Sequence, residues 1–371
     1  MKNNIRYSIN KEIFNIIFCV KKETSDISNQ LKKHYSDRKV LLVIDKNLDK
    51  NFRRCLLSDL KKLNRIDFHL LEVEGSKRNK NTNFVFKIID KCIKEKFTKK
   101  SVVISCGGGV VGDAAALASS LYFRGLIYYH VPTTMTAIVD SCIGGKTGIN
   151  YNGIINSVGN YYHPKSVFIS KNVIEKIPHR EFMSGIPEII KCGLIDNVKI
   201  FEMLLLNQNK YFKRDYDFLY KLIKLTLLTK IKFFKDDIFE NAKRLNLNFG
   251  HTFAHAIEIA LKGKKSDVIR HGEAVGVGML CEIYYSEGKS EKFLKLKNIL
   301  RFYNLSTDLN HLTKGKLKNS LKNEIFKNIF LDKKKIGKFP RIIKLIRVGK
   351  SKIIEMKNNK KIKDTIDKVL F

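Results

Sequence analysis

The sequence lacks the long apolar runs of a membrane protein. Of its 371 residues, 44% are hydrophobic, which is enough for a folded core. No stretch approaches the roughly 20 apolar residues of a transmembrane helix. The apolar segment 13–20 is broken by Asn15, and no small-residue cleavage site follows it. We therefore expect an early strand there rather than a signal peptide, and no membrane partner.

Closely paired cysteines are also missing. The chain has seven cysteines, an odd number, and no Cys-x-x-Cys pair. A disulfide framework uses an even number of cysteines, and thiolate zinc sites use closely spaced pairs. The pattern argues against both and predicts a reducing compartment, the cytoplasm.

Acidic residues are scarce relative to basic ones. Lys and Arg number 71 against 36 Asp and Glu, which gives a formal charge of +35. Nucleic-acid binding, attraction of an acidic small substrate and a lysine-rich composition are three explanations. Because the lysines are spread over the whole length without a nucleic-acid motif, we expect a solvated basic surface and no specific nucleic-acid partner. A basic nucleic-acid-binding protein on an inactive enzyme scaffold is the non-enzymatic alternative.

The chain shows no internal repeat or low-complexity linker, and its length predicts two domains. Short apolar runs at 40–44, 68–73, 102–106 and 127–131 alternate with helical segments, as in a parallel sheet wrapped by helices. Helical periodicity then dominates, for example at 198–206, 218–234 and 273–286, until a strand signal at 339–348. We predict a Rossmann-like α/β nucleotide-binding domain at residues 1–178 and a mainly helical metal- and substrate-binding domain at 179–371.

A glycine-rich turn follows the strand at 102–106. Residues 107–113 read Gly-Gly-Gly-Val-Val-Gly-Asp, and a small-residue helix is expected at 114–120. Glycines let the backbone approach a pyrophosphate, and a helix N-terminus offers free N–H groups. An ordinary tight turn is the alternative. No Asp or Glu stands near Thr133 to bind a ribose, so Asp45, at the end of the strand at 40–44, is the available candidate.

A second glycine turn at 140–150 contains Lys146, directly after Gly144 and Gly145. The earlier glycine of a Walker loop is absent, so this segment is not an NTPase loop. It either presents Lys146 to an anionic substrate or is a glycine turn with a surface lysine.

Two histidines, His251 and His255, stand four residues apart in a segment expected to be helical. At this spacing both rings leave one face, where neutral imidazoles can bind a divalent metal. Thr252 stands where a zinc protease needs Glu, which argues against a protease. Core histidines bonded to backbone groups are the alternative, and a third histidine, His271, follows.

Two charged residues, Glu188 and Lys191, interrupt the apolar segment 185–193. Charged groups in such a segment usually have a partner or a function. Glu188 could supply the carboxylate of a zinc site with two histidines and one open position.

Together these motifs resemble the 3-dehydroquinate synthase family of sugar-phosphate cyclases, over roughly residues 40–350. The matching segments are 107–113, 132–134, 139–150, 185–193, Lys230 followed by Asp237, Glu240 and Arg244, 248–258, 271–279 and 332–334.

The resemblance implies an NAD- and metal-dependent phosphorus–oxygen lyase of the shikimate pathway, usually a homodimer with zinc or cobalt. Members convert 3-deoxy-D-arabino-heptulosonate 7-phosphate, an anionic keto-sugar acid, into 3-dehydroquinate and phosphate. They do so by transient oxidation with NAD, phosphate elimination, re-reduction and intramolecular aldol closure.

The resemblance also implies roles for individual residues. The metal ligands would be Glu188, His251 and His271, with His255 beside the metal as a proton relay. Further catalytic residues would be Lys146, Lys191, Asp140 and Glu240. Substrate would bind to Arg124 of a neighbouring subunit and to Asn156, Lys230, Arg244, Asn248 and Lys333 or Lys334. NAD would bind to Asp45, Asn47, Gly75, Gly107, Gly108, Gly109, Val110, Val111, Gly112, Asp113, Thr133, Thr134 and Lys146.

Departures from the family pattern cluster on the cofactor side. Where the family has Gly-Glu-x-x-Lys, Ser76 replaces the glutamate, and the lysine is either lost to Asn79 or shifted to Lys80. Ile155 replaces an NAD-contacting lysine, and Lys176 replaces a threonine. We therefore expect weaker NAD binding than in members with the usual residues.

Two enzymatic alternatives stay open. One is another sugar-phosphate cyclase, and the other is a metal-dependent polyol dehydrogenase, which would release NADH. The joint presence of Arg244, Asn248 and Asn156 favours a substrate with a carboxylate.

Overall fold

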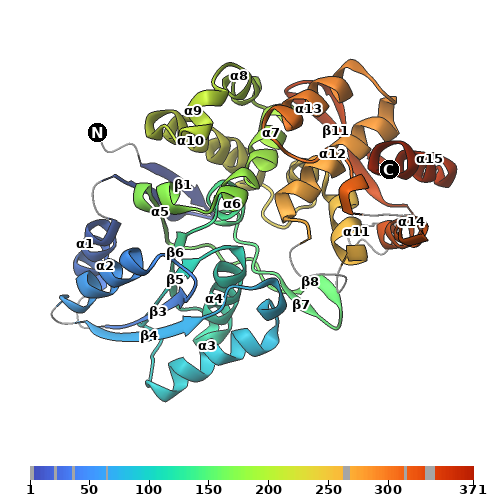
Figure 1. Cartoon of the computed structure of the whole chain (residues 1–371). Helices are drawn as coiled ribbons and strands as arrows, with labels where there is room; N and C mark the ends of the chain where they lie inside the picture. Colours follow the sequence, from blue (N-terminus) through green and yellow to red (C-terminus); the bar gives the residue numbers. More distant parts are fainter. Residues whose placement is uncertain are drawn as a thin grey trace. The chain divides into compact units, whose positions relative to one another are not determined.

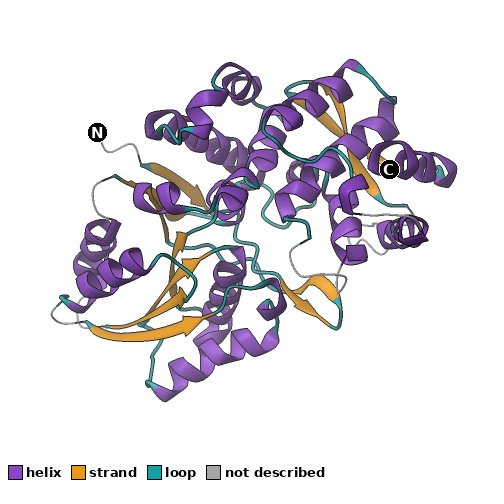
Figure 2. Ribbon diagram, viewed as in Figure 1, coloured by secondary structure: helices purple, strands orange, loops and turns teal. Residues whose placement is uncertain are grey.

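The structure is a computed structural model that describes residues 4–20, 23–35, 38–63, 66–261, 268–312, 316–330 and 339–371. The chain separates into two compact units, Met1–Phe182 and Met183–Phe371 (Figure 1). The first combines a mostly parallel sheet with helices, and the second is mainly helical (Figure 2), which confirms the expected fold class. The division of functions expected at residue 178 stays a prediction.

A seven-stranded sheet in the order β1-β2-β9-β6-β5-β3-β4 forms the centre of the first unit. Neighbouring strands from β2 to β4 run parallel, whereas β1 pairs antiparallel with β2. The strands are β1 (Ile5–Ile9), β2 (Glu12–Cys19), β3 (Lys39–Asp45), β4 (Asp67–Val73), β5 (Val102–Gly107), β6 (Ile127–Pro132) and β9 (Ser166–Ser170). A separate antiparallel hairpin consists of β7 (Ile149–Tyr151) and β8 (Ile154–Val158).

Helices follow most of these strands. The α-helices are α1 (Glu23–Tyr35), α2 (Lys50–Lys61), α3 (Thr82–Lys94), α4 (Gly109–Leu121), α5 (Lys171–Lys176) and α6 (His179–Met183), the last of which reaches the boundary in sequence between the units. Short turns of other helix types are η1 (Lys77–Asn79), η2 (Tyr122–Arg124) and η3 (Ala137–Ser141).

The central strands are buried on both faces. Leu41 and Val43 of β3 belong to one apolar cluster with Phe84 of α3 and Ala115 of α4. Leu42, which points to the opposite face because side chains alternate along a strand, is also fully buried. A continuous apolar run of this kind is typical of parallel strands with helices on both sides.

The chain changes its direction across the sheet between β3 and β5. From β3 it moves outward to β4 and then returns to place β5 on the other side of β3. In open parallel sheets, such a switch point creates a crevice at the carboxyl ends of two strands, where ligands bind. Here these ends are Asp45 and Gly107.

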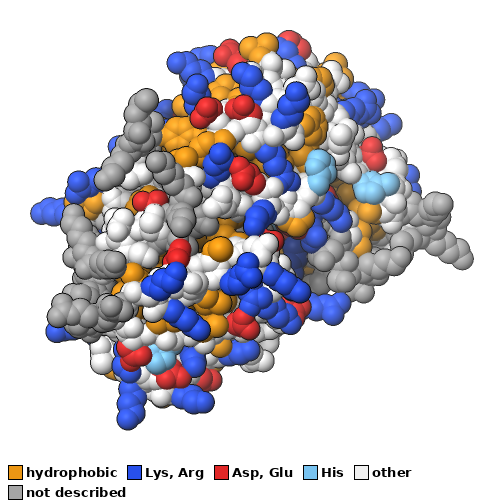
Figure 3. All heavy atoms as spheres, turned by 60° about the vertical axis from the view of Figure 1, so that its left-hand side comes forward, with side chains coloured by type: hydrophobic (Ala, Val, Ile, Leu, Met, Phe, Trp, Pro, Cys, Tyr) orange, Lys and Arg blue, Asp and Glu red, His pale blue; other side chains and the backbone are white. Residues whose placement is uncertain are grey.

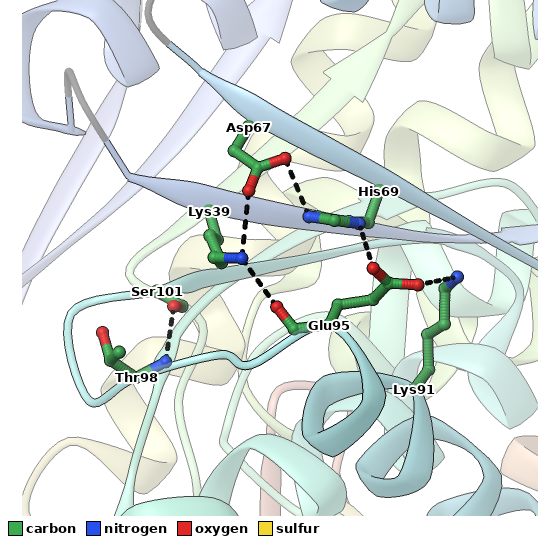
Figure 4. Close-up of polar contacts among 7 residues, drawn as sticks. All are labelled: Lys39, Asp67, His69, Lys91, Glu95, Thr98 and Ser101. Atoms are coloured by element: carbon green, nitrogen blue, oxygen red, sulfur yellow. Dashed lines mark hydrogen bonds and ion pairs between the residues drawn. The ribbon is translucent and has the colours of Figure 1, made fainter.

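A polar cluster fixes the outer edge of the sheet, where β4 lies (Figure 4). The His69 ring lies between two carboxylates, 2.9 Å from Asp67 and 3.1 Å from Glu95. Lys39 lies 3.1 Å from Asp67 and also donates a hydrogen bond to the Glu95 carbonyl, while Lys91 pairs with the Glu95 carboxylate. An ion pair and hydrogen bonds therefore join β3, β4 and the C-terminal end of α3. Charged side chains also protect an edge strand from pairing with another chain.

The second unit packs helices against one another and against a two-stranded sheet. The strands are β10 (Arg341–Arg347) and β11 (Lys350–Glu355). The longer helices are α7 (Ile186–Ile195), α8 (Val198–Leu206), α10 (Tyr216–Phe234), α11 (His251–Leu261), α12 (His271–Glu287), α13 (Glu291–Phe302) and α14 (Lys316–Ile329). Shorter elements are α9 (Gln208–Phe212), η4 (Lys243–Asn248), η5 (Asn310–Leu312), α15 (Asn359–Thr365) and η6 (Ile366–Leu370).

The predicted strands correspond to β2, β3, β4, β5, β6 and β10, and the predicted long helices correspond to α8, α10 and α12. One boundary was wrong: the helix expected at 114–120 begins at Gly109. Gly109 to Asp113 are therefore its first residues and not a loop that precedes it. The strands β1, β7, β8, β9 and β11 were not predicted.

Within the described part of the chain, none of the helices combines the length and the apolar character needed to cross a bilayer. Lys and Arg side chains are spread over the face drawn in Figure 3, among Asp, Glu and apolar groups. On this face they do not gather into one stripe.

Candidate metal and dinucleotide sites

Helix α7 places two opposite charges inside the core of the second unit. Pro187 stands at the start of the helix, where its missing N–H costs no hydrogen bond, and every residue of the helix is buried. The Glu188 and Lys191 side chains are each 1% exposed and form an ion pair one helical turn apart. The sequence-based expectation that these charges have partners inside an apolar stretch is confirmed.

Two imidazoles from other helices face the same carboxylate. His251 begins α11 and His271 begins α12. The Nε2 atom of each ring lies 3.6 Å from Glu188 Oε1. Ligand atoms from all three residues lie within 4.8 Å of one another. The structure therefore brings together the three residues that were expected to bind a metal.

The other ring nitrogen of each histidine meets an acceptor. His271 Nδ1 lies 3.1 Å from Glu258 Oε2, and His251 Nδ1 lies 3.3 Å from the carbonyl oxygen of Phe249. An acceptor at Nδ1 favours the tautomer with the proton on that nitrogen, which leaves the Nε2 lone pair directed at Glu188. Glu258 is thus a supporting residue that the sequence analysis missed. Its place seven residues after His251, two helical turns along one face, was the available signal.

These three residues fit a divalent cation. Beyond its ion pair with Lys191, the buried Glu188 carboxylate accepts no hydrogen bond from the described residues. Oε2 faces the ammonium and Oε1 faces both imidazoles, so one oxygen is available to a metal. A tetrahedral ion with bonds of about 2.0–2.2 Å separates its ligand atoms by roughly 3.3–3.6 Å, close to the spacing found here.

Glycines let the three helices approach closely enough for this convergence. A Cβ atom at Gly272 would lie 1.7 Å from the Ser184 carbonyl oxygen, just before α7. A Cβ atom at Gly278 would lie 2.0 Å from the Gly250 carbonyl oxygen, just before α11. The glycines of the segment 271–279 therefore place the start of α12 directly against the residues that precede the other two helices.

His255 lies beside the three candidate ligands but is not one of them. Its ring centroid is 5.5 Å from that of His251 and 6.2 Å from that of His271. Helical spacing alone pairs His251 with His255 as joint ligands. The structure instead groups His251 with His271, which is twenty residues away in sequence, together with Glu188.

The second unit also buries three cationic side chains, on elements that include α7, the helix of Glu188. Lys191, Lys230 and Arg244 are 1%, 5% and 3% exposed. They belong to α7, α10 and η4, which pack against one another. Arg244 donates to the Ile238 carbonyl at 2.6 Å and lies over the Phe234 ring. Buried cations are stabilised by anionic groups, and a planar guanidinium can bind a carboxylate or phosphate through two hydrogen bonds.

The loop between α10 and η4 is held in one conformation. Asp237 accepts hydrogen bonds from the backbone N–H groups of Asn241, Ala242 and Arg244. Burial alone would raise the pKa of Asp237, but these donors outweigh it and hold the pKa below its usual range. Asn248 donates to Glu240 Oε1 at 2.6 Å, and Glu240 adopts a left-handed conformation with φ of 61°.

In the first unit, several residues expected to bind NAD lie at the carboxyl ends of the strands that flank the switch point. A Cβ atom at Gly75 would lie 2.3 Å from Asp45 Oδ2, so glycine allows the ends of β3 and β4 to approach this closely. Asp45 Oδ1 accepts a hydrogen bond from the Asn47 backbone. A carboxylate is thereby held at the end of β3, where a ribose binds in related sheets.

The glycine-rich segment forms the start of α4. Gly108 is the N-cap and offers no side-chain cap to the first N–H groups of this 13-residue helix. Those groups and the dipole of the helix can stabilise a pyrophosphate. The Thr133 N–H donates to the Gly107 carbonyl, and Thr134 packs against Gly108. The expected NAD-binding residues therefore form one group around the ends of β3, β5 and β6, and this arrangement fits a dinucleotide.

Three buried polar side chains form a cluster that contacts α4, and the sequence analysis did not identify them. Ser105 Oγ lies 2.7 Å from both Tyr128 OH and His130 Nδ1, and Tyr128 donates to the Gly112 carbonyl. A Cβ atom at Gly112 would lie 2.9 Å from the His130 ring. Burial lowers the pKa of His130 to about 4, so the ring is neutral at pH 7. Strand alternation does not distinguish these residues from ordinary core positions.

Of the remaining expected residues of the first unit, Asp140 and Lys146 follow β6 in the chain, whereas Arg124 lies between the C-terminal end of α4 and the start of β6. Asp140 lies in η3, and Lys146 lines one small cavity together with Asp113 and Ser141. Arg124 is exposed, in a left-handed turn with φ of 61°. Lys333 and Lys334 lie outside the described residues, so their expected role in substrate binding stays a prediction.

Two of the departures make contacts of their own. Lys176 Nζ lies 2.6 Å from Asp49, the N-cap of α2, and forms an ion pair with it within the first unit. Lys80 contacts Asp113 and Asn156, whereas the Asn79 side chain donates to the Glu74 carbonyl.

Comparisons with known proteins agree along the length of the chain. The family models for the N-terminal and C-terminal parts of 3-dehydroquinate synthase match residues 70–184 and 185–335. A 3-dehydroquinate synthase of Thermodesulfovibrio yellowstonii is 34% identical over 331 residues, 88% of this chain and 89% of the relative. One of Ruminiclostridium cellulolyticum is 32% identical over 367 residues, 98% of each chain.

Solved structures share the fold. A 2-deoxy-scyllo-inosose synthase complexed with carbaglucose-6-phosphate, NAD⁺ and Co²⁺ has a TM-score of 0.83 at 24% identity, covering 99% of this chain and 100% of that one. A 2-epi-5-epi-valiolone synthase from Streptomyces hygroscopicus with NAD⁺ and Zn²⁺ has a TM-score of 0.82 at 20% identity, covering 98% of each chain. At this identity the solved structures show only the fold, whereas the sequence matches show the family. The chain belongs to the 3-dehydroquinate synthase family.

Proposed function

We propose that this chain is a phosphorus–oxygen lyase that converts 3-deoxy-D-arabino-heptulosonate 7-phosphate into 3-dehydroquinate and inorganic phosphate, in the shikimate pathway. The observation that carries the proposal is the convergence of Glu188, His251 and His271 in a member of this family. Bound NAD would take up and return one hydride, and a divalent zinc or cobalt ion would acidify a substrate hydroxyl.

The protein's own groups would move protons and hold the substrate. His255, whose ring lies beside His251 and His271, would relay a proton, since imidazole titrates near neutral pH. Lys191 would keep the Glu188 carboxylate oriented through their ion pair. We assign Asp140 to the substrate hydroxyls, Lys146 to the phosphate region, and Glu240 to the support of Asn248.

Fixed cations would bind the two acidic ends of the substrate. Lys230 and Arg244 are buried, and the planar guanidinium of Arg244 suits a carboxylate or phosphate better than an ammonium does. Asn156 and Asn248 would add hydrogen bonds, and Lys333 or Lys334 would add a further charge. In a homodimer, the exposed Arg124 would reach the site of the neighbouring subunit.

NAD would bind at the crevice of the first unit, with its ribose at Asp45 and its pyrophosphate at the start of α4. With Ser76, Asn79, Ile155 and Lys176 at positions where the family has other residues, we propose weaker NAD binding than in members with the usual ones. Calorimetry that gives equal affinity for this chain and such a member would refute this part of the proposal.

The assay for the activity supplies the heptulosonate phosphate, NAD and Zn²⁺ or Co²⁺ to the purified chain. We expect stoichiometric release of phosphate and formation of 3-dehydroquinate, with no net gain of NADH absorbance. Accumulation of NADH would instead indicate a polyol dehydrogenase. Phosphate release only from other phosphorylated sugars would indicate a different cyclase.

We also propose a reducing compartment, the cytoplasm, for this chain, since none of its seven cysteines is in a disulfide and six of them are buried. A nucleic-acid-binding role on an inactive scaffold predicts steeply salt-dependent binding of DNA or RNA without phosphate release. The same purified protein can be tested for both properties.

A further inference from the structure

The two-stranded sheet of the second unit leaves one edge of β10 without a neighbouring strand among the described residues. The Met356 N–H donates to the Pro340 carbonyl, so the even-numbered residues of this segment face the β11 side. Backbone groups alternate in direction along an antiparallel strand. The Arg341 carbonyl, the Ile343 N–H and the Leu345 carbonyl therefore point to the other edge. Such groups need partners, because a buried backbone group that is left unpaired is costly.

Side chains from three successive helices supply these partners. The Thr252 hydroxyl of α11 donates to the first of the two carbonyls at 2.7 Å. The Glu282 carboxylate of α12 accepts a hydrogen bond from the N–H at 2.8 Å. The Lys292 ammonium of α13 donates to the second carbonyl at 2.9 Å. The order donor, acceptor, donor matches the edge of β10, so the three helices take the place of a third strand.

Two of these side chains belong to the helices that begin with the candidate imidazole ligands. Thr252 directly follows His251 and is 2% exposed. Glu282 is fully buried, about three turns along α12 from His271. Charged side chains are almost never fully buried unless they are paired. Here the carboxylate binds the backbone of β10, so one strand is bonded to both helices.

The β10–β11 hairpin also contacts α7 and η4. The turn residue Gly349 donates its N–H to the Leu194 carbonyl at 2.8 Å, in the last turn of α7, where carbonyls lack a partner within the helix. Its φ of 81° and a Cβ position 2.6 Å from the Val198 side chain both favour glycine. Ser351 of β11 donates to the Asn246 side chain of η4 at 2.8 Å. One hairpin thus contacts all three helices that carry the candidate ligands.

We propose that the β10–β11 hairpin fixes the spacing of the candidate metal ligands, with Thr252 and Glu282 as its positioning residues. Metal–ligand distances in a well-formed site vary by only about 0.2 Å, so the three helices must be held firmly. Loss of either hydrogen bond would let α11 or α12 move relative to β10. The hairpin follows residue 335, the last that the family models match. The inference rests on the metal site of the proposed function.

The test is a Co²⁺ titration of the metal-free chain, followed by visible absorption. The absorption of bound Co²⁺ depends on the kind and geometry of its ligands, so it reports their positions as well as the affinity. Thr252→Val keeps the shape of the side chain and removes the donor, whereas Thr252→Ser keeps the hydroxyl. We expect Thr252→Val to weaken Co²⁺ binding about tenfold and to shift the absorption, as changes behind metal ligands do. Thr252→Ser should recover most of the affinity.

A second pair of variants tests α12. Glu282→Met removes the acceptor for the β10 backbone and should weaken Co²⁺ binding and shift the absorption in the same way. Glu282→Gln retains an acceptor oxygen and should bind Co²⁺ more tightly than Glu282→Met.

The control variant is Thr365→Val. Thr365 is fully buried like Glu282, but its hydroxyl donates to the Lys361 carbonyl within its own helix, α15. Thermal unfolding of the metal-free variants measures how much stability each change costs. Thr365→Val should lose stability without any change in Co²⁺ affinity or absorption. If neither Thr252→Val nor Glu282→Met folds, Ser351→Ala, at a half-buried position of β11, takes their place and should weaken Co²⁺ binding.

Co²⁺ affinity and absorption in Thr252→Val equal to those of the original chain would overturn the inference. Failure of Thr252→Ser to bind better than Thr252→Val, or an equal loss of affinity in Thr365→Val, would overturn it as well. Because the titration needs no turnover, a chain that shows the expected Co²⁺ binding but releases no phosphate would contradict the proposed function alone. Phosphate release together with unchanged Co²⁺ binding in all variants would contradict the inference alone.

Discussion

At the scale of single residues, the Glu188 carboxylate is the central group of the candidate metal site. It is 1% exposed, and its two oxygens face different partners, an ammonium at Oε2 and two imidazole nitrogens at Oε1. A charge so deep in a core is costly unless it is paired or coordinates a metal. The position of Glu188 is therefore explained by the Lys191 ammonium and the two imidazoles beside it and not by packing.

Two of the three clustered histidines, His271 and His255, should behave differently when each is replaced by alanine. His271→Ala removes an Nε2 atom directed at Glu188, so we expect loss of bound metal and of activity. His255→Ala should retain the metal and lose turnover by about 100-fold or more, as expected for a proton-transfer group. Metal content by atomic emission, measured beside the rate, checks both, and equal metal loss in the two variants would mean that the ligands are wrongly assigned.

A second prediction at this scale concerns the pH dependence of stability. The pKa of His130 is about 4 in the folded chain because the ring is buried, against about 6.5 when the chain is unfolded. Between these values the unfolded chain binds a proton that the folded chain does not. The contribution of the neutral His130 ring to the free energy of unfolding is therefore fully present above about pH 6.5. It is lost as pH falls toward 4, by up to about 3 kcal/mol.

Urea unfolding at several pH values measures this effect. His130→Gln removes the titrating ring and should flatten the dependence between pH 6.5 and 4, even if it lowers stability overall. A variant in which stability falls over this range as steeply as in the original chain would show that other groups are responsible.

The sequence predicted the candidate metal ligands better than the residues that hold the site in place through hydrogen bonds. Glu188 stood out as a charge in an apolar segment and His251 by its helical spacing from His255, whereas the set of Glu188, His251 and His271 came from the resemblance to the family. Local spacing could not reveal that His251 meets His271, since that contact depends on how α11 and α12 pack. Glu258, Ser105 and His130 were missed because a polar residue in a helix or strand gives no signal until its partner is known.

At the scale of elements, two glycines of α12 allow close contacts with the backbone of neighbouring segments. Gly272 allows the helix to touch the Ser184 backbone, and Gly278 allows it to touch the Gly250 backbone. Helix propensity alone favours alanine over glycine by about 1 kcal/mol. Alanine should therefore stabilise α12 unless the close approach outweighs propensity.

We expect Gly272→Ala to destabilise the unit and to reduce metal binding, because its Cβ would overlap a backbone oxygen that cannot rotate away. Gly276→Ala is the matched control in the same helix, since its Cβ would meet mainly the Leu300 side chain at 3.2 Å, which can shift. Thermal unfolding and metal content should separate the two variants. Similar behaviour of both would contradict the packing argument.

Elements with one clear periodicity were predicted, and elements defined by distant pairing were not. The buried strands β3, β5 and β6 have continuous apolar runs, so the sequence identified them within a residue or so. The hairpin strands β7 and β8 are short and partly exposed, and β9 is defined by its pairing with β2 and β6. The start of α4 was misplaced because its glycines were assigned to a loop.

At the scale of the whole molecule, the two units contribute different chemistry to one proposed reaction. The first carries the residues at the carboxyl ends of β3 and β5 that are expected to bind NAD, and the second carries the buried carboxylate, the imidazoles and three buried cations. The charge of +35 adds no defined site to this account. Family membership joins the two sets of residues in function, since both halves of the family model match the chain.

The most direct test of the central claim, that Glu188, His251 and His271 hold one divalent cation on which the reaction depends, is a metal titration of the chelated chain. We predict no phosphate release without metal, and full recovery at one equivalent of Zn²⁺ or Co²⁺ per chain. Glu188→Gln should show no recovery at that ratio. Phosphate release that persists after complete removal of metal, or recovery in Glu188→Gln equal to that of the original chain, would contradict the account.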